Sequence, residues 1–461
     1  MRWTIEGIAE AVDASRVIGA RDAARLVADG VSTDTRALRP GEAFVAIRGE
    51  RFDGHDFVAE AMRKGASCAV VDEAYARAGP KEGSAAPVVI VRDTVEALGR
   101  LAARVRNEST IPWIGITGSA GKTTTKELAA AALGPLGPAL KSPASLNNRI
   151  GVPLTVLALS PDHRAAVVEV GTGGPGEIAP LAGIVRPTVA VVTTIGPAHL
   201  EGFGDVEAVA REKAELMRAL GSDGVAVLPA ESEWLGTLRE AAPGRVVTFG
   251  LSDGADVRGE RIAQHEDGTT RFVTGGTEVI LRLTGIANVM NALAALAAAE
   301  AAGVSVGEAA TRIGEVEPPP MRGRLREGRR LRVFDDCYNA NPLSFEAALA
   351  TWAAVPARGR RWVVAGDMLE LGEASPALHE ELGRCIARSG AEMVLAAGDY
   401  ATDIARGCDI ENVEAVADAD EAAKRALELA RDGDLILVKG SRGVGLERVV
   451  EALVGYGAVA P

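Results

Sequence analysis

A glycine-rich segment that ends in lysine and threonine carries the sharpest chemical signal in the sequence. It runs Gly115-Ile-Thr-Gly-Ser-Ala-Gly-Lys-Thr-Thr-Thr125, after an apolar run typical of a strand and before an alanine-rich run typical of a helix. Glycines in such a loop let backbone N–H groups turn toward phosphate oxygens, and the helix N-terminus favours negative charge. Lys122 would reach the β- and γ-phosphates of ATP, and the Thr123 hydroxyl would bind Mg²⁺. The residues expected to contact the nucleotide here are Gly115, Thr117, Gly118, Ser119, Ala120, Gly121, Lys122, Thr123 and Thr124.

The glycine spacing of this segment departs from the common phosphate-loop form. That form has glycine five residues before Gly121, where this chain has Ile116, and the glycines stand instead at 115, 118 and 121. The alternative is a glycine-rich turn that happens to precede a lysine. Because a strand precedes the segment and a helix follows it, the sequence favours a phosphate loop.

Three further side chains are candidates, since a phosphate loop supplies only one protein ligand to Mg²⁺. Glu169 ends the apolar run that begins at Ala165, and the carboxyl ends of parallel strands border the crevice where open α/β sheets bind ligands. His199 follows the next apolar run, and Lys213 lies 14 residues further on in a helical pattern. Taken alone, a loop histidine is more often structural and a helix lysine more often a solvated charge. Residue type and position therefore favour only Glu169 as a metal ligand.

Apolar runs alternate with helical patterns over most of the chain, and these elements must position the candidate residues. Strands are expected at 113–117, 165–170, 189–193, 361–365, 393–397 and 435–439, and helices from Lys122, at 206–220 and at 287–302. Alternation of this kind predicts βαβ units and a mostly parallel sheet. The predicted fold class is α/β.

Two segments rich in proline and glycine predict the domain boundaries. They are Ala78–Pro87 and Glu315–Gly323, and the second contains three successive prolines, which cannot continue a helix. We expect an N-terminal domain at 1–90, a central domain at 91–317 and a C-terminal domain at 318–461. Three domains also suit a chain of 461 residues, at about 150 residues per domain.

Composition and charge narrow the possible partners. With 47% apolar and 25% charged residues the chain has globular usage, and its net charge of -13 disfavours nucleic acid. The four cysteines are scattered without metal-like spacing, which is typical of reduced thiols. No apolar run approaches the length of a membrane span, and the N-terminal segment carries acids where an export signal needs an apolar core. We expect a cytoplasmic protein without membrane insertion, acting as a monomer.

The segment TGSAGKTT, the strand end at Glu169 and the pair His199 and Lys213 together resemble the Mur ligase family. These ATP-dependent enzymes form amide bonds in peptidoglycan precursors. The resemblance implies three domains: a small N-terminal α/β domain, a central mononucleotide-binding parallel sheet with the phosphate loop, and a C-terminal Rossmann-like domain. It also implies two Mg²⁺ ions, one held by Thr123 and Glu169 and the other by His199 and a carbamylated Lys213. Catalytic roles are thereby expected for Lys122, Glu169, His199 and Lys213.

Longer blocks resemble the family member that joins D-alanyl-D-alanine to UDP-N-acetylmuramoyl-tripeptide. They include Ser145–Thr155, Ala198–Gly204, Asp335–Pro342, Gly366–Glu373 and Val438–Gly443. The resemblance implies substrate contacts at Asp34, Arg36, Asn147, Asn148, Lys439, Ser441 and Arg442, with Arg48 and His55 as weaker candidates. It implies further nucleotide contacts at Asn288, Asn291, Arg324, Asp336, Tyr338, Asn339 and Asn341.

The chain departs from the family pattern at Thr194, where asparagine is usual, and at Ala287, where histidine is common. These departures affect contacts expected around the second metal and the nucleotide. The implied reaction proceeds through an acyl phosphate, and closure about a hinge at 318–323 would exclude water from it. Two alternatives stay open: a related Mur-type ligase with another amino-acid acceptor, and a phosphate-loop NTPase without ligase activity.

Overall fold

The computed structural model describes residues 2–19, 25–49, 51–78, 87–265, 268–328 and 330–456. The chain divides into two compact units, one made of residues 1–115, 136–172 and 177–188 and the other of 116–135, 173–176 and 189–461. Most of the first expected boundary segment, Ala78–Pro87, lies outside the described residues. The boundaries at 90/91 and 317/318 stay a prediction.

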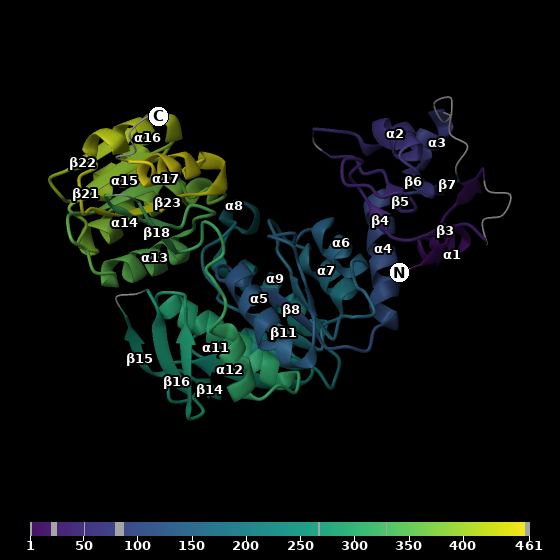
Figure 1. Cartoon of the computed structure of the whole chain (residues 1–461), viewed down its shortest axis with the longest axis horizontal. Coiled ribbons are helices and arrows are strands. Elements are labelled where there is room, and N and C mark those ends of the chain that lie inside the picture. Colours follow the sequence, from purple (N-terminus) through teal and green to yellow (C-terminus); the bar gives the residue numbers. More distant parts are fainter. Residues whose placement is uncertain are drawn as a thin grey trace. The chain divides into compact units, whose positions relative to one another are not determined.

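The N-terminal part of the chain folds around a five-stranded sheet (Figure 1). The strand order is β2 (Arg16–Ile18), β7 (Val88–Val91), β6 (Cys68–Asp72), β5 (Ala43–Val45) and β4 (Val31–Ser32), with only the β2–β7 pair antiparallel. A short antiparallel pair, β1 (Trp3–Thr4) with β3 (Val27–Ala28), accompanies it. The helices of this part are α1 (Ile5–Ala11), α2 (Val58–Arg63), α3 (Glu73–Ala78) and α4 (Thr94–Glu108). Buried side chains form one apolar cluster around Val70 and Val89 and another around Val71 and Ile90, as expected for a strand covered on both faces.

The middle of the chain builds a seven-stranded sheet whose order is β14-β13-β12-β11-β8-β10-β9. The strands are β8 (Trp113–Thr117), β9 (Ala139–Lys141), β10 (Ala165–Glu169), β11 (Val189–Val192), β12 (Val225–Pro229), β13 (Arg245–Gly250) and β14 (Val257–Arg258). The β9–β10 pair and the pairs from β11 to β14 are parallel. A separate antiparallel sheet contains β15 (Glu260–Gln264), β16 (Thr270–Thr274) and β17 (Thr277–Leu281).

Helices α5 (Lys122–Ala132), α6 (Gly151–Leu157), α7 (Ile178–Val185), α8 (Leu200–Phe203), α9 (Val206–Arg218), α10 (Leu235–Ala241), α11 (Ile286–Ala301) and α12 (Val306–Ile313) connect these strands. The residues that precede α5 and α9 explain where the candidate residues Lys122 and Lys213 lie. Gly121 adopts the left-handed conformation that precedes α5, so the helix begins at Lys122. The Asp205 side chain accepts the Ala208 N–H and caps α9, the helix that carries Lys213.

The C-terminal part contains a six-stranded sheet in the order β18-β19-β23-β20-β21-β22. Only the pair β18 (Arg324–Glu327) with β19 (Arg332–Asp335) is antiparallel, and the other strands are β20 (Arg361–Gly366), β21 (Met393–Ala397), β22 (Val413–Val416) and β23 (Leu435–Lys439). Helices α13 (Pro342–Ala354), α14 (Ser375–Arg388), α15 (Ala401–Gly407), α16 (Ala419–Leu429) and α17 (Glu447–Val454) cover it, over one apolar cluster around Trp352 and another around Trp362. The predicted α/β class is therefore confirmed.

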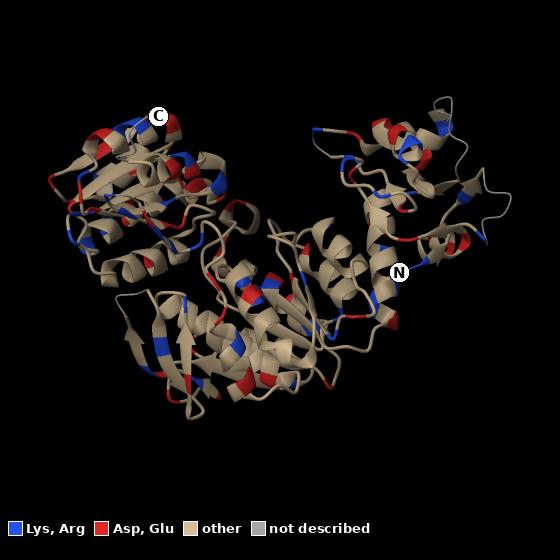
Figure 2. Ribbon diagram, viewed as in Figure 1, with Lys and Arg blue, Asp and Glu red and all other residues tan. Residues whose placement is uncertain are grey.

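Charged residues of both signs are interspersed along the outer helices of this C-terminal sheet (Figure 2). They form ion pairs within one helix, such as Arg384–Glu381 and Arg425–Glu428, and between helices, such as Arg448–Asp420. No helix among the described residues is both long enough and apolar enough to cross a membrane.

Candidate functional site

The phosphate loop occupies the turn between β8 and α5, as the sequence predicts. Gly118 and Gly121 have φ of 148° and 83°, values that favour glycine. A Cβ atom on Gly118 would lie 1.9 Å from the Thr193 hydroxyl, and one on Gly121 would lie 2.3 Å from Asn291 Oδ1. The Lys122 ammonium folds back over the loop and donates to the Gly118 carbonyl at 2.7 Å. These two glycines are therefore required by close approach as well as by backbone conformation.

The loop that follows β11 holds the phosphate loop in place. The Ser119 N–H donates to the Thr194 carbonyl at 2.8 Å, and the Ala120 N–H donates to the Thr194 hydroxyl at 3.2 Å. The Ser119 hydroxyl donates to the Gly196 carbonyl at 3.0 Å and accepts the Gly196 N–H at 3.1 Å. The N–H groups of Ser119 and Ala120 are therefore both engaged by the loop that follows β11.

The remaining loop residues differ in their surroundings. Gly115 and Thr117 lie within β8, and the buried Thr117 hydroxyl has no hydrogen-bond partner in the described part of the chain. Thr123 and Thr124 are buried in the first turn of α5. An unsatisfied buried hydroxyl at the strand end that enters the loop is consistent with a polar ligand there.

Asn291 of α11 bonds to α5, and Asn288 of the same helix bonds to Asn291. The Thr125 hydroxyl donates to Asn291 Oδ1 at 3.2 Å, and Asn291 Nδ2 donates to Asn288 Oδ1 at 3.1 Å. Asn288 Nδ2 in turn donates to the Thr284 carbonyl at 2.9 Å. Asn291 thus packs beside Gly121, and Asn288 is linked to the phosphate loop through its hydrogen bond with Asn291.

Lys213 is not the solvated helix lysine that its residue type suggests. Its side chain is 2% exposed within α9. Burial and, to a lesser extent, the nearby Lys122 ammonium lower the pKa of Lys213 to about 7, while Glu212 acts in the opposite direction. Glu212 accepts the Gly176 N–H at 2.8 Å. The surroundings of Lys213 therefore disfavour the charged form of its amine.

His199 lies at the start of α8 with φ of 55°. Its Nδ1 contacts a carboxylate oxygen of Glu370, and the Glu201 N–H donates to the Glu370 carbonyl at 3.1 Å. A histidine whose Nδ1 is held by a carboxylate keeps Nε2 available for a cation. Glu370 is not among the candidates expected from sequence, although it lies in the block 366–373.

Glu169 is 1% exposed at the end of β10. Asn147 Nδ2 donates to the Glu169 carboxylate at 2.8 Å, and the Glu169 N–H donates to the Ser142 hydroxyl at 3.1 Å. Asn148 Oδ1 accepts the Gly151 N–H at 2.9 Å where α6 begins. Asn147 therefore orients the candidate metal ligand, and Asn148 shapes the adjoining turn.

Among the described residues, no three His, Cys, Asp or Glu side chains are grouped closely enough to hold a metal ion. A magnesium ion at the phosphate loop would therefore complete its coordination with oxygen atoms of the nucleotide and of water. Such hard oxygen ligands suit Mg²⁺, which usually retains water and binds few protein groups.

In the C-terminal sheet, a buried lysine organises the loop after β19. Lys439 is 2% exposed, and its ammonium donates to Asp336 Oδ2 at 2.6 Å and to the Asn339 carbonyl at 3.0 Å. Burial raises the pKa of Asp336, and Lys439 opposes that effect. The Arg322 guanidinium lies 4.0 Å from the centre of the Tyr338 ring. Lys439 therefore orders this loop through its bonds to Asp336 and Asn339.

The other residues expected in this part lie nearby or at the surface. The Ser441 hydroxyl accepts the Leu369 N–H at 2.9 Å. Arg442 is exposed and contacts Met321 Sδ at 3.2 Å, and Arg324 is the exposed first residue of β18. Asn341 caps the N-terminus of α13, and its Nδ2 donates to the Ser119 carbonyl of the phosphate loop at 3.2 Å.

The N-terminal candidates form two separate groups. Arg36 makes a paired contact with Asp34, through Nη2 to Oδ2 at 2.6 Å and Nε to Oδ1 at 2.9 Å, which lowers the pKa of Asp34 to about 2. The Arg36 side chain stays exposed to solvent in spite of this contact.

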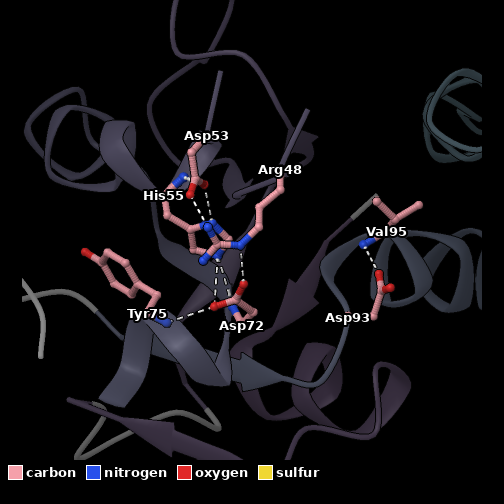
Figure 3. Close-up of polar contacts among 7 residues, drawn as sticks. All are labelled: Arg48, Asp53, His55, Asp72, Tyr75, Asp93 and Val95. Atoms are coloured by element: carbon pink, nitrogen blue, oxygen red, sulfur yellow. Dashed lines mark hydrogen bonds and ion pairs between the residues drawn. The ribbon is translucent and has the colours of Figure 1, made fainter. Parts of the chain in front are cut away.

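Arg48 and His55 belong to the second group, a network with two aspartates (Figure 3). Arg48 Nε donates to Asp72 at 2.8 Å, and the guanidinium also contacts Asp53. His55 Nδ1 lies 2.7 Å from Asp53 Oδ1, and its Nε2 accepts the Asp72 N–H at 3.1 Å. Since both nitrogens of the buried His55 ring are engaged, this histidine links the turn at Asp53 to the end of β6.

Family models match three stretches of the chain. The Mur ligase family catalytic domain matches residues 28–106, the Mur ligase middle domain 116–299, and the Mur ligase glutamate ligase domain 321–442.

Named relatives match over nearly the whole length. A UDP-N-acetylmuramoyl-tripeptide–D-alanyl-D-alanine ligase of Bacillus subtilis is 34% identical and covers 98% of this chain and 99% of its own. The enzyme of that name from Escherichia coli is 37% identical, with 94% and 96% covered.

Two solved structures are similar to this fold. MurF from Acinetobacter baumannii superposes with a TM-score of 0.90 at 31% identity, covering 98% of this chain and 99% of that one. A MurF ligase from Thermotoga maritima in complex with ADP gives a TM-score of 0.81 at 28% identity, covering 93% and 97%.

Proposed function

The chain belongs to the Mur ligase family, and we propose on that basis that it joins D-alanyl-D-alanine to UDP-N-acetylmuramoyl-tripeptide with ATP, in peptidoglycan precursor synthesis. The observation that carries the proposal is a phosphate loop, built on Gly118 and Gly121, in a chain that is similar over 98% of its length to a ligase of that name. The ADP complex of a similar enzyme supports ATP as the nucleotide. Because UDP-linked precursors and ATP are cytoplasmic compounds, we expect the reaction to take place in the cytoplasm.

A carboxylate does not react with an amine at neutral pH, so the chemistry needs activation. In the proposed reaction a carboxylate oxygen of the tripeptide attacks the γ-phosphorus of ATP, forming an acyl phosphate and releasing ADP. The amine of D-alanyl-D-alanine then attacks the acyl carbon, the amide bond forms, and inorganic phosphate leaves as the bond between the acyl carbon and the phosphate oxygen breaks. The amine loses a proton in that step.

The contribution of this chain is to gather and neutralise negative charge. The first-turn N–H groups of α5 and the Lys122 ammonium bind phosphate oxygens, while Thr193 and Asn291 leave no room for a side chain at Gly118 and Gly121. Arg36 and Arg442, both exposed, offer cations for the phosphates of the UDP-linked precursor and the carboxylate of the dipeptide. Positioning and electrostatic stabilisation of this kind account for most of the catalysis in phosphoryl transfer.

We also propose that Mg²⁺ binds at Thr123, Glu169, His199 and a carbamylated Lys213. When bound, Mg²⁺ neutralises charge on the transferring phosphoryl group. The support is the burial of Lys213 beside Lys122, because a carbamate would replace repulsion between two ammonium groups by attraction. The contact of His199 Nδ1 with Glu370 leaves Nε2 for the cation.

Phosphate release from ATP tests the proposed function. Release should require both UDP-N-acetylmuramoyl-tripeptide and D-alanyl-D-alanine, and the pentapeptide product should appear in equal amount by mass spectrometry. Release without any acceptor would identify an NTPase, and release with another amino acid in place of the dipeptide would identify a ligase of different specificity.

A further inference from the structure

Asn341 joins the C-terminal sheet to the phosphate loop through the two ends of one amide. Its Oδ1 accepts the Ser344 N–H at 2.8 Å and caps α13, while the Ser344 hydroxyl accepts the Asn341 N–H at 3.0 Å. Its Nδ2 donates to the Ser119 carbonyl at 3.2 Å, across 222 positions of sequence. The oxygen therefore serves helix α13, and the nitrogen serves a distant loop.

The Ser119 carbonyl belongs to the peptide group whose N–H is that of Ala120. That N–H donates to the Thr194 hydroxyl at 3.2 Å. In a trans peptide the C=O and N–H point in opposite directions, so Asn341 and Thr194 hold the same peptide plane from its two sides. Gly121, whose positive φ opens α5, is attached directly to the residue that follows this plane.

The rest of Ser119 is fixed as well. Its N–H is bonded to Thr194 and its hydroxyl to Gly196 in the loop after β11, and the residue is 7% exposed. Apolar packing accompanies the polar contacts, since a Cβ on Gly196 would lie 3.5 Å from the Leu343 side chain of α13. The N–H, the hydroxyl and the carbonyl of Ser119 are therefore all bonded within the protein. Asn341 is the partner of the carbonyl.

We propose that Asn341 is a positioning residue, which clamps the Ser119–Ala120 peptide so that the phosphate loop takes its binding conformation only when α13 is docked against it. The inference rests on the proposed function to the extent that this loop binds ATP. It gives Asn341 a role through the loop, in addition to the nucleotide contact expected from sequence. Nucleotide affinity thereby becomes coupled to the placement of the C-terminal sheet.

Substitutions of Asn341 can separate its role as the cap of α13 from its hydrogen bond to the Ser119 carbonyl. Asn341→Asp and Asn341→Ser retain a side chain that caps a helix, but neither offers the amide donor at that distance. Asn341→Ala loses both roles. The matched control is Asp418→Ala. Asp418 caps α16, another helix of the C-terminal part, by accepting the Asp420 and Glu421 N–H groups. That control loses a cap of comparable type away from the phosphate loop.

The readout is binding of Mg-ADP by calorimetry, which does not depend on turnover. Loss of one neutral hydrogen bond predicts about 3- to 10-fold weaker binding for Asn341→Ser. Asn341→Asp should bind more weakly still, because its carboxylate faces a carbonyl oxygen. Asp418→Ala should bind like the wild type, even though it melts at a lower temperature. Hydrogen exchange should quicken across 117–124 in Asn341→Asp while 342–354 stays protected.

Thr194→Val removes the partner on the opposite side of the same peptide plane, and keeps the inference testable if a variant at 341 fails to fold. It should weaken ADP binding in the same way, and the double variant with Asn341→Ser should lose less than the two effects multiplied. Wild-type affinity in Asn341→Asp, or equal losses in Asp418→Ala, would overturn the clamp. A wild-type protein that binds no nucleotide would instead defeat the proposed function.

Discussion

At residue 213 a lysine side chain is 2% exposed and lies near the ammonium of Lys122. Such an arrangement is costly for two cations in a medium of low dielectric constant. A carbamate at Lys213 removes the repulsion and supplies hard oxygen atoms to Mg²⁺. Substitution of Lys213 therefore tests the proposed chemistry directly.

Lys213→Ala should lower ligase activity about 100-fold or more, because the lost group carries charge stabilisation in the transition state. A short carboxylic acid such as acetate should restore part of that activity by replacing the carbamate oxygens. Steady-state assays with and without acetate give the measurement. The exposed Lys424→Ala on α16 is the control, and should keep full activity. Unchanged activity in Lys213→Ala would contradict the assignment.

Gly118→Ala should abolish most nucleotide binding. The added Cβ would lie 1.9 Å from the Thr193 hydroxyl, and φ is 148°. Strain of about 1–3 kcal/mol corresponds to an affinity loss of about 5- to 150-fold if the loop relaxes out of its binding conformation. Gly236→Ala on α10, where a Cβ meets nothing within 4 Å, should leave ADP affinity unchanged. Calorimetric titration with ADP compares the two.

At the scale of elements, His379 of α14 fixes the loop that follows β20. Its Nε2 accepts the Met368 N–H at 2.8 Å, and its Nδ1 donates to the Ser375 carbonyl at 2.6 Å. The ring stacks on Tyr400 with centroids 4.5 Å apart. Through this loop the histidine places Glu370, which contacts His199, and so one helix of the C-terminal sheet supports a residue of the candidate metal site.

Burial lowers the pKa of His379 below its ordinary value of 6.5. Below pH 6.5 the His379 ring therefore binds a proton in the unfolded chain more readily than in the folded protein. The stability contributed by the neutral ring is complete above pH 6.5 and declines as the pH falls through that value. The slope should reach at most about 1.4 kcal/mol per pH unit.

Urea denaturation of wild type and His379→Gln between pH 5 and 8 measures this effect. The variant should be less stable at pH 8, because it loses the ring and its contacts, and the difference from wild type should shrink toward pH 5. His163→Gln is the control, since that ring lies in a surface turn where it accepts the Ser160 N–H. A difference that stays constant with pH would show that His379 does not titrate in this range.

At the scale of the whole molecule, the segment 318–323 connects α12 to β18 and contains three prolines. Met321 and Gly323 have φ of 61° and 66° there. Prolines stiffen the connection, so any change of angle is confined to the few residues that follow them. Asn341 follows this segment in the chain and Ser119 precedes it, so their hydrogen bond joins the C-terminal part to the central part.

Small-angle scattering should show a smaller radius of gyration when ATP analogue, tripeptide precursor and dipeptide are all bound. Closure excludes water that would hydrolyse the acyl phosphate. The same titration on Asn341→Ser should need a higher nucleotide concentration to reach the compact form. A radius that stays constant with all substrates bound would contradict closure.

Much of the site could be read from residue order, because phosphate loops and strand ends depend on local geometry. The strands at 113–117, 393–397 and 435–439 match β8, β21 and β23, and the helix from Lys122 matches α5. Other elements shift by one or two residues, such as α9, which ends at Arg218 where a helix to 220 was expected. Lys213 was singled out only by resemblance, because no local pattern shows that a helix lysine is buried.

The α/β class, the phosphate loop and the family can be predicted from the sequence, since they depend on short-range periodicity and on contiguous motifs. The partners of individual polar atoms, in contrast, are known only from the folded chain. Ser119, expected to face the nucleotide, has its N–H, hydroxyl and carbonyl bonded to residues 194, 196 and 341. Lys439 faces Asp336 within the sheet. A hydrogen bond between residues that are far apart in the sequence leaves no spacing to read, because only the folded chain brings the donor and the acceptor together.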